Sequence, residues 1–211
     1  PVIVLTELRL SFPGSSNLPL ELSEGRISLD VLNSLRTQSL RMTRIVLTNL
    51  SMRGELSRQG VLRLAGFEGR SDESAEQLRT FLLNVELIAL RNNRLILTMP
   101  SGEVRDLGLD LQLFRDGSFR RVEATLSSSR GARIAVLGQG VGDPFQPELF
   151  SGQLYVNIHS TDLGAVKELL SDRTLPMWAN GAVDLQLWLN WDRGDPSLEA
   201  RLEGHDLLVT G

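Results

Sequence analysis

The sequence contains no cysteine, and this absence excludes disulfides, thiolate nucleophiles and sulfur-ligated metals together. It also contains no run of about 18 consecutive apolar residues, the length needed for a helix to cross a bilayer. No charged segment followed by an apolar stretch and a small-residue cleavage site opens the chain. Pro1 leads directly into an expected strand, and Leu207 to Thr210 stops within another. We therefore expect a piece of a longer protein, with targeting and anchoring segments outside it.

Aromatic residues make up only 5% of the chain, and the net charge is −4. Nucleic-acid binding usually needs a basic surface and stacking aromatics, so no nucleic-acid partner is expected. Lys167 is the only lysine among 22 basic residues. Arginine suits bidentate recognition of anions, but a GC-rich genome explains the same bias without any function, and we favour that explanation.

Catalytic chemistry is poorly represented. The only two histidines are His159, expected on the polar face of a strand, and His205, expected in a turn, and no Gly-x-Ser-x-Gly nucleophile motif occurs. Asp106 and Asp110 lie four apart on one strand face and are interpreted as solvated acids. A glycosidase would need two carboxyl groups at a defined separation, which spacing alone does not provide. We expect no catalytic residue, no metal site and no cofactor.

A short strand pattern recurs in the first 90 residues. Ile3 to Leu10 is repeated as Ile45 to Met52, 42 residues later, and more loosely as Val85 to Leu90. Within each copy, apolar residues at spacing two are followed by a jump of three, as from Leu47 to Leu50. A one-residue change of phase is typical of a β-bulge, which bends a strand. Repeats of this period indicate stacked supersecondary units.

Strict alternation of apolar and polar residues predicts further strands, each with one apolar face. Short turns are predicted between them, so these strands should be antiparallel. The turns are expected at 92–93, 100–102, 116–117, 129–131, 143–144 and 192–196. The glycine-rich stretch 138–146 is expected to be a loop between two parts of the chain.

Three helices are also predicted, at 29–39 with Ser28 as its N-cap, from about 71 to 82, and at 162–171. Each has a single apolar stripe, so each should lie against the sheet or close one of its ends.

The expected fold is therefore mainly β, a long, curved antiparallel sheet that forms an open hydrophobic groove, with a few short helices. A closed sandwich, whose inner faces fill each other, remains an alternative. The candidate lipid-binding residues lining the groove are Ile45, Leu47, Leu107, Leu109, Leu111, Leu113, Val122, Leu126, Leu154, Val156, Ile158, Val183, Leu185, Leu187 and Leu189.

Several segments resemble the AsmA-like family of bacterial bridge-like lipid transfer proteins. The run from Ile27 to Leu50, followed by Gln59-Gly60 and Leu62-Arg-Leu64, resembles the family's amino-terminal strand, helix and strand module, with Leu62 where tryptophan is usual. The segments 152–163 and 181–192 look like a conserved region of a large member. The resemblance divides the chain into an amino-terminal module, 1–68, and a continuing groove segment, 69–211, within one extended domain.

The resemblance implies a periplasmic protein of a Gram-negative bacterium, attached to the inner membrane by a helix outside this chain. Its groove would carry phospholipid between the inner and outer membranes and so support outer-membrane integrity. No catalytic residues and no cofactor accompany the family. The alternative function is a closed structural or adaptor module that binds a protein partner.

Overall fold

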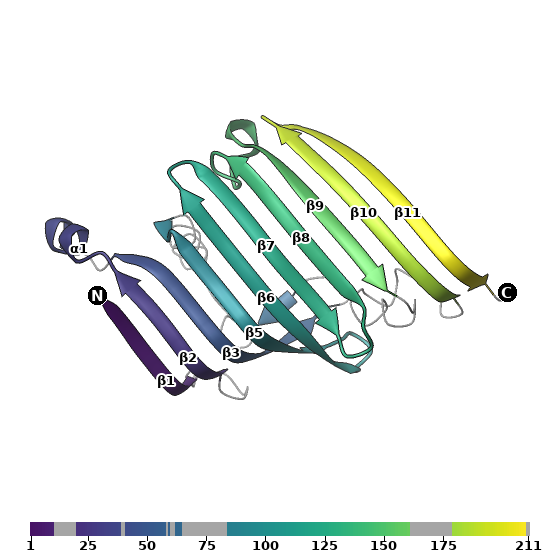
Figure 1. Ribbon diagram of the computed structural model, residues 1–211, viewed down its shortest axis with the longest axis horizontal. Coiled ribbons are helices and arrows are strands. Elements are labelled where there is room, and N and C mark those ends of the chain that lie inside the picture. The colour runs from purple at the N-terminus through teal and green to yellow at the C-terminus, as the bar shows by residue number, and fades with distance from the viewer. Residues whose placement is uncertain are drawn as a thin grey trace.

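The computed structural model describes residues 1–10, 20–38, 41–57, 59, 62–64, 84–160 and 179–209. All strands in these residues belong to one 11-stranded sheet, in the order β1-β2-β3-β5-β6-β7-β8-β9-β10-β11, with β4 paired to β3 (Figure 1). The strands are β1 (Val2–Leu10), β2 (Leu20–Leu29), β3 (Met42–Leu56), β4 (Leu62–Leu64), β5 (Leu87–Thr98), β6 (Val104–Asp116), β7 (Phe119–Ser128), β8 (Arg133–Val141), β9 (Ser151–Ser160), β10 (Ala179–Asp192) and β11 (Asp195–Val209).

The strands from β5 to β11 form the predicted antiparallel meander. Gly102, Gly117, Gly131 and Gly194 have positive φ in the turns, the conformation that glycine adopts most easily. The predicted turns at 100–102, 116–117, 129–131 and 192–196 are therefore confirmed.

One strand pair departs from the antiparallel prediction, because β3 and β5 run parallel. They are joined by residues 57–86, a connection long enough to bring the chain back to the end of the sheet where β3 begins. The sheet is thus mostly rather than wholly antiparallel.

The change of phase within the repeat is confirmed. Glu7, Asn49 and Asn92 have φ of 51°, 55° and 53°, left-handed conformations inside β1, β3 and β5. Beyond Asn49, Leu50 and Met52 are buried, as the jump from Leu47 requires. At Asn92 the register with β6 shifts between Leu90 and Asn93, as in a β-bulge.

Two predictions about this region are wrong. Ile45 pairs with Ile88, so the third copy of the repeat starts at Ile88 and not at Val85. Asn92 and Asn93, predicted as a hairpin turn, lie in the middle of β5. The Asn-Asn dipeptide supplies the left-handed residue of a bulge, a position that asparagine tolerates as readily as it does a turn.

The Asn93 side chain supplies hydrogen-bond partners to backbone groups beside the bulge. Its side chain is 3% exposed, and its Oδ1 accepts a hydrogen bond from the Leu50 backbone N–H at 2.9 Å. Its Nδ2 donates to the Leu109 carbonyl oxygen at 3.2 Å. Because buried backbone groups are costly when unpaired, this one side chain links β3, β5 and β6 where their ladders are irregular.

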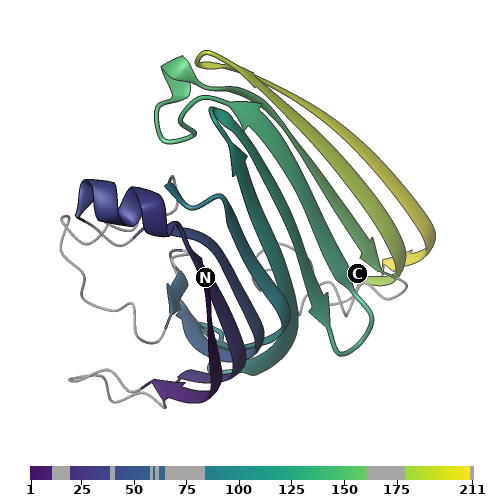
Figure 2. The ribbon, with the colours of Figure 1, turned by 60° about the vertical axis from the view of Figure 1, so that its left-hand side comes forward.

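The first predicted helix is shorter than expected. α1 spans Val31–Thr37, and β2 continues to Leu29, so the N-cap is Asp30 rather than Ser28. The Asn33 backbone N–H donates to Asp30 Oδ1 at 3.0 Å, and this bond lowers the pKa of that carboxyl. Leu32 and Leu35 are 82% and 74% exposed, so the apolar stripe of this helix does not lie against the sheet, which was one of the two predicted placements. Its position beside one end of the strands is visible in Figure 2.

The other two predicted helices, at about 71–82 and at 162–171, lie outside the described residues. The predicted loop at 138–146 is partly wrong, because β8 continues through Gly138 and Gly140 to Val141. The loop starts at Gly142 and leads into a short 3-10 helix, Pro147–Leu149.

We expect replacement of Asn93 by leucine to lower the free energy of unfolding by about 1–3 kcal/mol, since it leaves the Leu50 N–H buried without an acceptor. Chemical denaturation provides the measurement. The neighbouring Asn92→Gly variant is the control, and it should be neutral or slightly stabilising because Asn92 is exposed and already has positive φ. Equal losses in both variants would contradict the bridging role of Asn93.

Candidate functional site

The predicted groove residues all lie on one face of the sheet. Residues directly opposite each other on paired strands point to the same face, so the register identifies each row of side chains. One row crosses ten strands and consists of Ile3, Ile27, Ile45, Ile88, Leu113, Val122, Gly138, Leu154, Leu189 and Leu198.

Parallel rows of the same kind extend this apolar face along the strands. A second consists of Leu5, Gly25, Leu47, Leu90, Leu111, Ala124, Val136, Val156, Leu187 and Ala200. From β5 onward a third consists of Asn93, Leu109, Leu126, Ile134, Ile158, Leu185 and Leu202. Leu107 and Val183 lie two positions further along their strands on the same face.

The exposure of the side chains on this apolar face differs from strand to strand. The buried core residues gather on β2, β3, β5 and β6, where Leu107 is only 2% exposed. On β7, β9 and β10 most members of the rows are half-buried, and on β11 Leu198 and Leu202 are 66% and 67% exposed. Among the described residues no second sheet packs against the apolar face. Most row members in its carboxy-terminal half are therefore only partly covered.

Polar interactions on the opposite face explain most of the carboxylates noted in the sequence. Arg94 Nε donates to Asp106 Oδ1 and Oδ2 at 2.7 and 2.9 Å, and these bonds lower the pKa of the Asp106 carboxyl. Asp110 Oδ1 accepts from the Asn92 N–H at 2.7 Å and so caps the bulge. Both acids therefore connect β6 to β5 on the polar face.

The two histidines are exposed, as predicted. His159 Nδ1 lies 3.2 Å from Asp184 Oδ2 on the polar face. His205 lies within β11 and not in the predicted turn. Within the described part of the chain no cluster of histidine and acidic residues could hold a metal ion.

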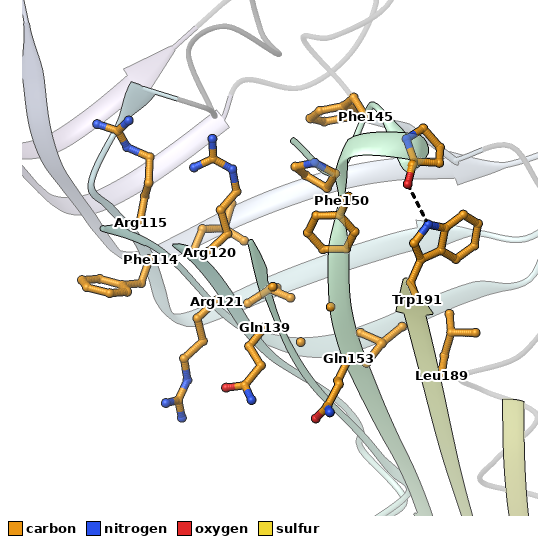
Figure 3. Close-up of a pocket in the computed structure, with 18 of the residues that line it drawn as sticks. Phe114, Arg115, Arg120, Arg121, Gln139, Phe145, Phe150, Gln153, Leu189 and Trp191 are labelled. Atoms are coloured by element: carbon orange, nitrogen blue, oxygen red, sulfur yellow. Dashed lines mark hydrogen bonds between the residues drawn. The ribbon is translucent and has the colours of Figure 1, made fainter. Parts of the chain in front are cut away.

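A cavity of about 420 Å³ lies at one end of the apolar face, beside the loop that joins β8 to β9 (Figure 3). Phe145 and Phe150 from this loop, Leu154 from β9 and Trp191 from β10 contribute to its apolar lining. Trp191 Nε1 donates to the Pro147 carbonyl oxygen at 3.1 Å, which fastens the loop to β10. Trp191 therefore anchors the loop at the end of β10.

The glycines at 140 and 152 form the floor of this cavity. They are cross-strand partners, and the Phe150 ring lies over both. A Cβ at Gly140 would lie 2.6 Å from Phe150 Cε2, and one at Gly152 would lie 2.7 Å from Phe150 Cζ. Glycine is thus required in these strands for close packing of an aromatic ring, which is why the Gly-x-Gly-x-Gly pattern does not mark a loop.

Arg115 and Arg120 also line the cavity, and the sequence interpretation missed them. They are cross-strand partners that continue the apolar face beyond Leu113 and Val122. In Figure 3 both side chains point to the same side of the sheet as Phe150, whereas Arg121, Gln139 and Gln153 point away. The signal was present in the alternation, because 115 continues the leucine spacing of 107 to 113 and 120 precedes 122 by two.

No protein-family model, curated protein or solved structure matches this chain. None of the helices in the described ranges is both long enough and apolar enough to traverse a bilayer.

Replacing Gly140 by alanine should lower the free energy of unfolding by about 1–3 kcal/mol, since the new methyl group overlaps the Phe150 ring and the Ser151 carbonyl oxygen. Thermal or chemical unfolding measures the loss. Gly108→Ala is the matched control on β6, where the added Cβ meets only the rotatable Ser127 hydroxyl at 2.6 Å. A Gly140 variant as stable as the Gly108 variant would argue against this packing.

Proposed function

We propose that this chain is a segment of a lipid transfer protein in which a curved, open groove, lined by the apolar face, accommodates the acyl chains of phospholipid. It would belong to the AsmA-like family, near the large member YhdP. The parent protein would be attached to the inner membrane of a Gram-negative bacterium, span the periplasm and support the outer membrane.

One observation carries the proposal: the continuous apolar face has no covering layer among the described residues. Soluble monomers rarely expose contiguous apolar patches above about 300–600 Å², and larger ones mark interaction sites. Rows of leucine and valine that continue from strand to strand offer an alkyl chain the same contacts at every step.

The energetics favour such a surface for lipid transport. A diacyl lipid with roughly 30 methylenes would need about 24 kcal/mol to enter water, at about 0.8 kcal/mol per buried CH₂. Transfer from a bilayer to an apolar trough exchanges one hydrocarbon environment for another, so the cost is small. The headgroup keeps its hydration outside the opening. A groove of this kind lowers the barrier without bond chemistry, and the proposed activity is therefore not enzymatic.

The alternative is a structural or adaptor module that binds a protein partner. In its closed-sandwich form it requires two facing sheets, and the described residues form one. An open apolar face could instead receive an apolar protein surface. The row members on β7, β9 and β10 are mostly half-buried, and no layer of the described residues covers them. Such a surface suits an alkyl chain as well as a protein partner, so the test must identify what is bound.

A photo-reactive amino acid at Leu187 should crosslink radiolabelled phospholipid when the purified chain is irradiated with phospholipid vesicles. The same residue at Gln186 should not, since 186 and 187 are adjacent on β10 but point to opposite faces. Leu109 and Asp110 on β6 provide a second matched pair. Equal lipid labelling on both faces, or none on either, would count against the proposal, and a protein adduct at Leu187 alone would favour the adaptor.

A further inference from the structure

Two arginines occupy positions on the apolar face where the alternation along β6 and β7 predicts apolar residues. Arg115 and Arg120 face each other across the β6–β7 hairpin. Like charges at directly opposed positions destabilise a strand pair. An anion bound between the two guanidinium groups would offset this repulsion.

Both arginines have buried N–H donors for which the described residues supply no acceptor. The Nε atoms of both and Nη1 of Arg120 are buried without a hydrogen-bond partner. Burial lowers the pKa of Arg120, repulsion from Arg115 lowers it further, and attraction by Asp143 acts in the opposite direction. Buried donors without acceptors cost free energy that a bound oxyanion would recover.

Other arginines in the sheet differ from this pair. Arg94 Nε donates a hydrogen bond to Asp106. Arg105 Nη2 lies 3.1 Å from Glu103 Oε2. Arg121 Nη2 lies 2.6 Å from Glu123 Oε1. Arg121 is the immediate neighbour of Arg120 but points to the polar face, where an acid is available. The Nε atom of Arg105 is buried in the same way, but Arg105 has a bonded carboxylate in Glu103, whereas no ion pair joins either arginine in the cavity to an acid among the described residues.

The surroundings specify the rest of a ligand. The cavity that contains the guanidinium groups is otherwise lined mainly by Phe145, Phe150, Leu154, Leu189 and Trp191. It opens onto the leucine rows, and the face continues from Arg115 to Leu107 over roughly 26 Å at about 3.3 Å per residue. An acidic group held here would have its alkyl tail directed along those rows.

We propose that Arg115 and Arg120 form a site for the oxyanion head, a carboxylate or a phosphate, of an amphiphile whose alkyl chain lies on the apolar face. This inference rests on the proposed function and adds a preferred charge to it. Guanidinium groups suit the site because their planar forks bind carboxylate or phosphate oxygens in pairs. The site would hold a lipid by its head at one end of the groove.

Trp191 lines the cavity and serves as the reporter. With Trp178 and Trp188 replaced by phenylalanine, tail-brominated lipids should quench Trp191 fluorescence on contact. Dibromostearate and its uncharged monoglyceride carry the same tail, so their affinities isolate the head. A brominated phosphatidate tests whether the acid can be the phosphate of a diacyl lipid rather than a free fatty-acid carboxylate.

The Arg115→Gln/Arg120→Gln variant should bind dibromostearate, phosphatidate or both more weakly by roughly tenfold or more, and the monoglyceride unchanged. Arg121→Gln is the matched control on the opposite face and should alter neither affinity. Arg120→Lys, tested alone, keeps the charge and should retain much of the binding. Thermal unfolding of each variant separates a loss of binding from a loss of fold.

The two proposals can fail separately. If acid and monoglyceride bind the unsubstituted cavity equally well and the double variant alters neither, the anion site is overturned while the apolar groove stands. If neither acid nor monoglyceride quenches Trp191 and no lipid crosslinks at Leu187, the lipid function itself is overturned. Acid binding that survives in the double variant also overturns the anion site.

Discussion

The structure depends on the pairing of apolar side chains across strands, and the described residues provide no second layer to cover them. In most β domains one sheet buries its apolar face against another sheet or against helices. Here the leucines pack against one another within the face, and the rows are continuous because the pairing of β6 to β10 has no register shift and that of β10 with β11 has none from Ala182 to Asp192. The same pairing that stabilises the sheet therefore produces the surface on which the proposed function depends.

Irregular positions adapt this regular pattern. Left-handed residues at Glu7, Asn49 and Asn92 change the phase of three strands, and the Asn93 side chain supplies the hydrogen bonds that the change removes. Glycines at 140 and 152 make room for Phe150, which gives the apolar face a cavity at one end. The polar face keeps its acids in ion pairs with arginine and in caps on backbone N–H groups. Each face thus has mainly one kind of chemistry, and the exceptions on the apolar face include Asn93, Arg105, Arg115 and Arg120.

Local periodicity predicted the strands and their faces well, because alternation at spacing two is set by backbone geometry and needs no knowledge of the partners. All the groove residues chosen from alternation, from Ile45 to Leu189, share one face. The errors arose at residues whose type is compatible with more than one local structure or environment. Asn92 and Asn93 were assigned to a turn, the glycines near 140 to a loop, and Leu32 and Leu35 to a buried helix face that is exposed.

Spacing along the chain was enough to establish most of the strands, the side chains that alternate within them and the first two changes of phase, since these follow from local backbone geometry. Tertiary structure decided that β3 and β5 lie parallel, that Phe150 covers Gly140 and Gly152, and that Arg115 and Arg120 meet in one cavity. These features depend on register between strands and on the course of loops. Many sequences with the same alternation are compatible with several registers, and only the packing of distant side chains selects one of them.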